Sequence, residues 1–164
     1  MAAPGRYRWL WISLAILALD RASKSAIERL TAEGYVRPLI DGLLNLVHTH
    51  NPGIAFGLLA DRQSWWLTAL LAAGAAGVIL LLVWLLATGR AGGGRSQVAL
   101  SLILAGAAGN LADRLLHGGV IDFVDVHWRG HHWPAFNVAD SAITIGALLL
   151  AVDLFFPRRS SEIQ

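Results

Sequence analysis

Three long apolar segments restrict what this chain can fold into. They cover about residues 65–87, 97–116 and 137–156, and each is near the roughly 20 residues that a helix needs to cross the hydrocarbon core of a bilayer. Apolar residues make up 55% of the 164 positions and charged residues 15%, whereas about 25% of the residues in a soluble domain are charged. The sequence therefore predicts an integral membrane protein.

A fourth segment, about residues 8–30, is less uniform because its apolar run ends at Leu19 and charged residues follow. An apolar run after basic residues can be a secretory signal, but no small-residue cleavage site follows Leu19. Asp20 and Lys24 are spaced i, i+4, so they can pair on one helix face, with Lys24 extending toward the membrane interface. We therefore predict a fourth transmembrane helix in which this ion pair supports the fold.

The basic residues predict the orientation of these spans. Six of them fall in the two tails and the short second connection, and the others on the opposite side are spread over longer loops. Short segments rich in lysine and arginine stay in the cytoplasm, so both termini are expected there. The net charge of +2 then follows from membrane topology and does not indicate a nucleic-acid partner.

The cysteine and histidine content excludes several kinds of chemistry. The chain has no cysteine, which excludes disulfides, thiolate metal sites and a cysteine nucleophile. Its histidines include the neighbouring pairs His48 and His50, and His131 and His132. None of these is an i, i+4 pair on a helix with a carboxylate nearby, so we predict no metal site.

Two connections are predicted to lie on the opposite side from the termini. Residues 31–64 contain a short strand-like run near Leu43–Thr49 with glycine and proline around it, which indicates a small β element. Residues 117–136 are aromatic and amphipathic, so we expect a loop or helix on the membrane surface. The predicted fold is one domain over residues 1–164, an all-α membrane bundle of four transmembrane helices with this β element and surface segment.

Asp113 and Asp140 are the most unusual residues in the apolar segments. Each lies about one turn inside a predicted span, and the two spans are consecutive and antiparallel, so both carboxylates are expected at similar depth. An aspartate at the centre of a membrane helix costs roughly 2.5 to 3.5 kcal/mol. Asn110 shares a helix stripe with Asp113, and Asn137 shares one with Asp140. The pair therefore predicts a functional site inside the bundle.

Two neighbouring carboxylates can carry out acid–base chemistry. They cannot both ionise easily, so they share a proton, and one can act as base while the other acts as acid on a water that attacks an amide. This is aspartic-peptidase chemistry. A buried ion pair of Asp113 with Arg114 or Lys24 is the structural alternative. A proton-coupled transporter and a non-catalytic scaffold are the rival functions, although a proton relay should run through the whole membrane and residues 67–86 carry no charge.

Five motifs, in this order along four apolar segments, show a family resemblance. They are Asp20-Arg21-Ala22-Ser23-Lys24, Asn51-Pro52-Gly53-Ile54-Ala55-Phe56-Gly57, Gly109-Asn110-Leu111-Ala112-Asp113-Arg114, Val120-Ile121-Asp122-Phe123 and Phe136-Asn137-Val138-Ala139-Asp140. Together they cover almost the whole chain, which resembles the lipoprotein signal peptidases (signal peptidase II), a family of membrane aspartic peptidases. The first motif of that family usually has glutamine where Arg21 stands and threonine where Ser23 stands.

The resemblance implies a function and roles for individual residues. It implies an enzyme of the bacterial cytoplasmic (inner) membrane, active near the outer face, that cuts prolipoproteins just before a diacylglyceryl-modified cysteine, with Asp113 and Asp140 as the catalytic pair. The implied substrate-binding residues are Asn51, Gly53, Asn110, Arg114 and Asn137. From the residues themselves we expect Asp20, Lys24 and Asp122 to support the structure, with Asp122 capping a helix or hydrogen-bonding backbone. The resemblance implies no metal or cofactor, and we expect a monomer in contact with membrane lipid.

Overall fold

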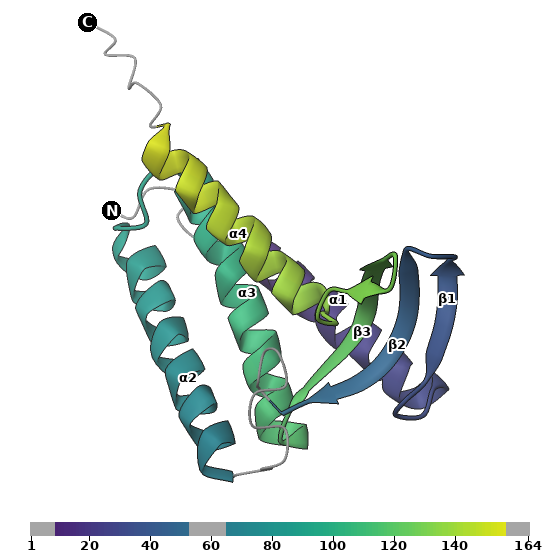
Figure 1. Cartoon of the computed structure of the whole chain (residues 1–164). Coiled ribbons are helices and arrows are strands. Elements are labelled where there is room, and N and C mark those ends of the chain that lie inside the picture. The colour runs from purple at the N-terminus through teal and green to yellow at the C-terminus, as the bar shows by residue number, and fades with distance from the viewer. Residues whose placement is uncertain (1–8, 53–64, 157–164) are drawn as a thin grey trace, which may run out of the picture.

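The computed structural model describes residues 9–52 and 65–156. In chain order the elements are α1 (Leu10–Leu30), β1 (Val36–Ile40), β2 (Leu44–Asn51), α2 (Trp65–Thr88), α3 (Gly94–His117), β3 (Val120–Trp128), β4 (His131–His132) and α4 (Val138–Phe155). The four helices alternate in direction, and the sheet lies at the end of the bundle where α1 and α3 finish and α4 begins (Figure 1). The predicted helices are confirmed to within a few residues.

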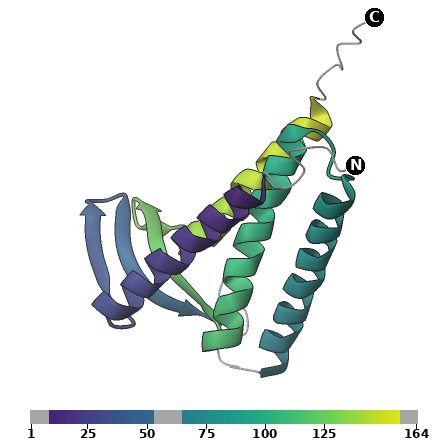
Figure 2. The same ribbon diagram turned by 180° about the vertical axis from the view of Figure 1, so that it is seen from behind.

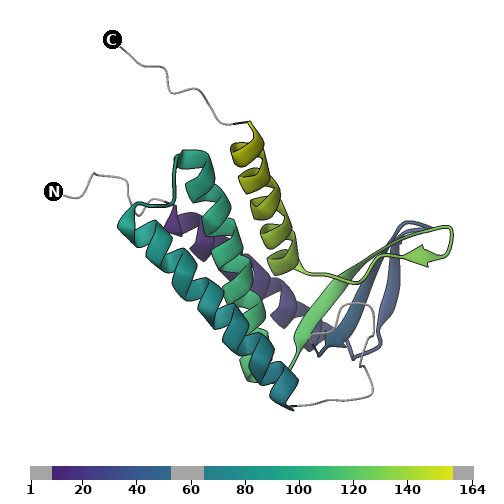
Figure 3. The ribbon, with the colours of Figure 1, turned by 60° about the vertical axis from the view of Figure 1, so that its left-hand side comes forward.

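Helix α3 lies at the centre of the bundle. It packs against α2 on one side and against α1 and α4 on the other (Figure 3). Viewed from behind, α1 crosses α3 and α4 obliquely (Figure 2). A side chain at Gly106 would overlap the carbonyl oxygen of Ala139 in α4, and a Cβ at Gly146 would lie 2.7 Å from the carbonyl oxygen of Ala99. These glycines therefore allow α3 and α4 to approach each other closely.

Three of the described helices, α2, α3 and α4, are long and apolar enough to cross a membrane by length and composition. Helix α2 contacts α3 through an apolar cluster around Leu82, Leu100 and Leu104, and most of its remaining surface is exposed. Helix α1 is not among the three, because its second half carries five charged residues. A fourth transmembrane helix is therefore not confirmed by this criterion.

The sheet corrects the prediction for residues 117–136. Its order is β1-β2-β3-β4 with antiparallel neighbours. Residues 117–136 therefore supply β3 and β4 and do not form a surface helix or an extended surface loop. The run from Val120 to Val126 is rich in β-branched residues, which favours a strand, and pairing with β2 buries Val120 and Ile121. The β element predicted within residues 31–64 is present as β1 and β2, but it is half of a sheet shared by both connections.

The turn from α3 into β3 determines where the site forms. Gly118 has φ of 76° and its N–H donates to the carbonyl oxygen of Arg114 at 3.1 Å, a common way for a helix to end. The chain then reverses into β3, where Asp122 pairs in register with Thr49 of β2. This brings Asp122 back beside the last turns of α3.

Candidate active site

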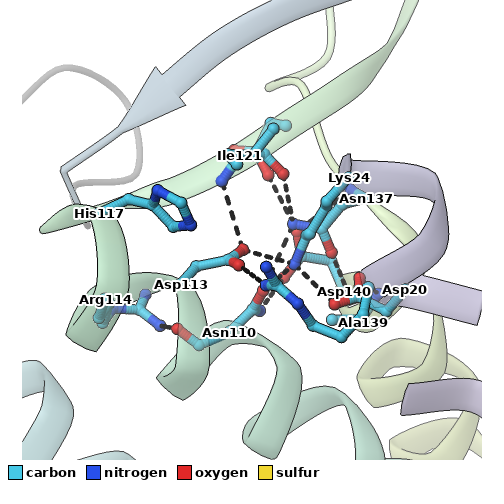
Figure 4. Close-up of polar contacts among 12 residues, drawn as sticks. Asp20, Lys24, Asn110, Asp113, Arg114, His117, Ile121, Asn137, Ala139 and Asp140 are labelled. Carbon is cyan, nitrogen blue, oxygen red and sulfur yellow. Dashed lines mark hydrogen bonds and ion pairs between the residues drawn. The ribbon is translucent and has the colours of Figure 1, made fainter. Parts of the chain in front are cut away.

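Polar side chains from α1, α3, β3 and α4 meet beneath the sheet (Figure 4). Asp20, Lys24 and Asp113 have no exposed surface, and Asp122 and Asn137 are 2% and 1% exposed. Buried charges and amides are stable only with partners. The residues form two groups according to their partners: an ion cluster around Lys24, and a second group next to a cavity.

Lys24 is the centre of the ion cluster. Its Nζ lies 2.9 Å from Asp20 and 2.7 Å from Asp113 and donates to the side chain of Asn110 at 3.2 Å. The predicted ion pair with Asp20 is confirmed. The prediction that Lys24 extends to the membrane interface is wrong, because two buried carboxylates hold the ammonium group inside the bundle.

Asp113 belongs to the same cluster. Its carboxylate contacts Arg21 as well as Lys24, and its second oxygen accepts from the backbone N–H of Ile121 at 3.4 Å. The buried ion pair considered as an alternative is therefore present with Lys24. Arg114, the other candidate partner, instead donates to the carbonyl oxygen of Asn110 at 3.1 Å.

Asp140 lies at the first turn of α4. Asn137 is the N-cap residue, its side chain accepts from the N–H of Asp140 at 2.9 Å, and its own N–H donates to the Asp140 carboxylate at 3.3 Å. This reciprocal arrangement is a capping box. The other carboxylate oxygen accepts from the amide of Asn110 at 2.7 Å. Asp140 is only half-buried, so part of its carboxylate remains accessible.

Asp122 faces the same region from β3. Its two oxygens accept from the amide groups of Asn137 at 2.7 Å and Asn51 at 3.1 Å. Asp122 was expected to cap a helix or bond backbone, whereas its partners among the described residues are these two side-chain amides. Burial raises the pKa of Asp122 to about 7, and the negative charge of Asp140 contributes to the rise. Asp122 thus holds a proton at a pH where an ordinary aspartate has lost it.

A cavity of about 290 Å³ opens between these two carboxylates and the loop before α4. Its lining residues are Asn51, Arg114, Asp122, Trp133, Pro134, Ala135, Phe136 and Asp140. The structure thus brings together four of the predicted site residues, Asn51, Arg114, Asp122 and Asp140. Asn110 and Asn137 are not among the cavity's described lining residues but donate hydrogen bonds to Asp140 and Asp122. Asp113 is not among the described residues that line it. Gly53 lies outside the described residues.

Sequence reasoning gave Arg21 no role at the site and assigned Asp122 only to structural support. The contact of Arg21 with Asp113 joins positions 92 apart, which no local pattern predicts. The sequence did contain a signal for Asp122, because it is the single charged residue in the apolar run from Val120 to Val124. A carboxylate in an apolar run is costly to bury, and the same argument had indicated a function for Asp113 and Asp140.

The family model of signal peptidase (SPase) II matches residues 12–156. The chain belongs to the signal peptidase II family. It is 44% identical to the lipoprotein signal peptidase of Aeromonas hydrophila, covering 95% of this chain and 93% of that protein. It is equally similar to the lipoprotein signal peptidase of Pseudomonas putida, covering 96% and 92%. The chain is therefore a peptidase of the aspartic type, from a family that processes prolipoproteins.

Two solved bacterial membrane enzymes share the fold of this signal peptidase II. A structure obtained by the in meso method at 2.3 Å resolution has a TM-score of 0.81 and 29% identity, covering 96% of this chain and 94% of that one. A second, at 1.9 Å resolution, has a TM-score of 0.79 and 30% identity, covering 92% and 94%. Together with the apolar helices, this likeness indicates a membrane enzyme.

Proposed function

We propose that this peptidase removes the signal peptide from diacylglyceryl-modified prolipoproteins, cutting just before the lipidated cysteine, with Asp122 and Asp140 as the catalytic pair. The observation that carries the proposal is the shared cavity of these two carboxylates. Asp122 replaces Asp113 in the pair predicted from sequence. Asp113 is fully buried against two cations, so neither its charge nor its surface is available to a substrate.

The different surroundings of the two carboxylates suggest their roles. The raised pKa of Asp122 makes it the proton donor near neutral pH. Asp140 accepts a proton from a water molecule as the water oxygen bonds to the carbonyl carbon, and Asp122 donates its proton to the carbonyl oxygen. When the C–N bond breaks, Asp140 passes its proton to the leaving amine and Asp122 regains one from the hydroxyl.

Arg114 and Asn51 are proposed to position the peptide in the cavity. Both line it, and a guanidinium and a carboxamide can each donate hydrogen bonds to the carbonyl groups of a substrate. Asn110 and Asn137 are then positioning residues, because they bond the carboxylates from outside the cavity lining.

We also propose that a single domain spans the bacterial inner membrane four times, with both termini in the cytoplasm and the sheet at the outer face. The alternating helices support this, since the start of α1 and the end of α4 lie at the end away from the sheet (Figure 3). The charged half of α1 is compatible with a membrane position because three of its charges, Asp20, Arg21 and Lys24, are paired inside the bundle. We propose a monomer that meets its lipid-anchored substrate in the membrane.

Cleavage of a synthetic diacylglyceryl prolipoprotein by purified protein in detergent tests the catalytic pair. Asp122→Asn and Asp140→Asn should each lower kcat by about 10² to 10⁴, the usual contribution of a general acid or base. Asp113→Asn should lower the melting temperature while the folded fraction keeps most of its kcat. A folded Asp113→Asn protein without activity, together with an active Asp122→Asn protein, would restore Asp113 to the pair.

A further inference from the structure

A second cavity begins at Asp140 and continues along α4. It has a volume of about 400 Å³ and is lined by Trp133, Phe136, Asp140, Ser141, Thr144 and Ile145. Asp140, Trp133 and Phe136 also line the first cavity, so the two meet at a proposed catalytic carboxylate. The first cavity is lined by charged and amide groups, whereas Asp140 is the only charged residue among the described residues that line the second.

The second cavity leads onto an exposed apolar stripe. From Ser141 the same face of α4 continues through Ile145, Leu148, Val152 and Phe155, at the i, i+4, i+7 spacing of one helix face. These four apolar side chains are between 44% and 73% exposed. Helix α4 is one of the helices apolar enough to cross a membrane, so this stripe would face lipid tails.

We infer that the cavity along α4 receives an acyl chain of the diacylglyceryl group on the substrate cysteine. This inference depends on the function proposed above. A lipid attached beside the scissile bond must leave the catalytic site close to Asp140, and its chain must end in hydrocarbon. The cavity meets both requirements, because it starts at Asp140 and opens toward the lipid-facing stripe. A peptide side chain is shorter than an acyl chain and would occupy only the part of the cavity next to Asp140.

Binding of the acyl chain in this cavity is expected to position the substrate at the catalytic site and to add little to its affinity for the membrane. An acyl chain is already solvated by lipid, so moving it into the cavity gains little hydrophobic free energy. A chain fixed along α4 instead sets the distance between the modified cysteine and Asp140, and such placement lowers the barrier by holding reacting atoms in position. Blocking the cavity should therefore harm long-chain substrates and spare short-chain ones.

The test compares two substrates with one peptide sequence, carrying either a dipalmitoyl or a diacetyl glyceryl group on the cysteine. Ile145→Trp fills the cavity, and Thr144→Phe does so from the next position. Leu148→Trp is the matched control, since Leu148 is 62% exposed on the same stripe but is not among the cavity residues. Melting temperatures establish that each variant is folded.

We expect Ile145→Trp and Thr144→Phe to lower kcat/KM for the dipalmitoyl substrate about tenfold, which corresponds to about 1.4 kcal/mol. The diacetyl substrate should change by less than about twofold, as should both substrates with Leu148→Trp. Equal losses with both substrates would assign the cavity to a peptide side chain and overturn the inference, as would no loss with either. If wild-type protein cleaves neither substrate, the proposed function itself fails.

Discussion

Replacing Lys24 with methionine would measure the contribution of the ion cluster to the fold. Lys24 lies 2.9 Å from Asp20 and 2.7 Å from Asp113, and none of the three side chains is exposed. Methionine has a similar length and flexibility, so it fills most of the space. The main change is therefore the loss of one positive charge between two buried carboxylates.

The size of the effect follows from burial. Removing one partner of a buried ion pair costs about 3 to 5 kcal/mol, because the remaining charge keeps its desolvation penalty. The ion pair between Arg95 and Asp153 is the matched control, since its atoms lie 3.4 Å apart and its side chains are 26% and 23% exposed. Such a pair contributes about 0 to 1 kcal/mol, so Arg95→Gln should be nearly neutral.

Thermal unfolding in detergent at pH 7 would measure both variants. For a chain of this size, about 1 kcal/mol corresponds to about 2 to 4 °C, so Lys24→Met should lower the melting temperature by about 6 to 20 °C. Arg95→Gln should lower it by less than about 4 °C. If Lys24→Met melts within about 3 °C of the wild type, Asp20 and Asp113 do not depend on this charge, and our explanation of the buried cluster is wrong.

Two further predictions concern Asp122 and the contact between α3 and α4. The folded-state pKa of Asp122, about 7, is higher than the unfolded value of about 3.9, so folded protein binds the extra proton between these pH values and stability falls as pH rises from about 4 to 7. Asp122→Asn should therefore raise the melting temperature more at pH 8 than at pH 4, and an equal change at both would contradict the assignment. Gly106→Ala should destabilise the protein by about 1 to 3 kcal/mol because the new Cβ would overlap Ala139. Gly74→Ala in α2 is the control, since no atom lies within 4 Å of its new Cβ, and it should be neutral or stabilising. Equal effects of the two variants in thermal unfolding would refute the packing explanation.

The sequence predicted the helices well because length and apolar content are local properties. The predicted segment 65–87 ends one residue before α2 does, and the predicted segment 137–156 is one residue longer than α4 at each end. Strand β3 was missed because its burial is irregular, with Val120, Ile121 and Asp122 all buried in succession, and regular alternation is what identifies a strand. Its pairing with β2 also joins distant parts of the chain, which no local pattern shows.

The candidate site shows the same limit at the level of single side chains. Asp113 and Asp122 are both acids near apolar neighbours, and sequence alone does not distinguish an acid neutralised by cations from one that faces a cavity. The distinction depends on Arg21 and Lys24, which α1 brings to Asp113 from the other end of the chain. Asp140, which was predicted to lie in a functional site inside the bundle, does line the cavity, and its catalytic role stays a prediction.

Asn137 contacts both proposed catalytic carboxylates. Its side-chain nitrogen donates to the Asp122 carboxylate at 2.7 Å, and its backbone N–H donates to the Asp140 carboxylate at 3.3 Å. The spacing between acid and base thus depends on this one residue, and a shift of α4 relative to β3 would lengthen one of the two bonds. A substrate that pushes α4 and β3 apart would therefore not be cleaved. Substrates can in this way be selected by their fit between the two elements, without a residue that recognises particular peptide side chains.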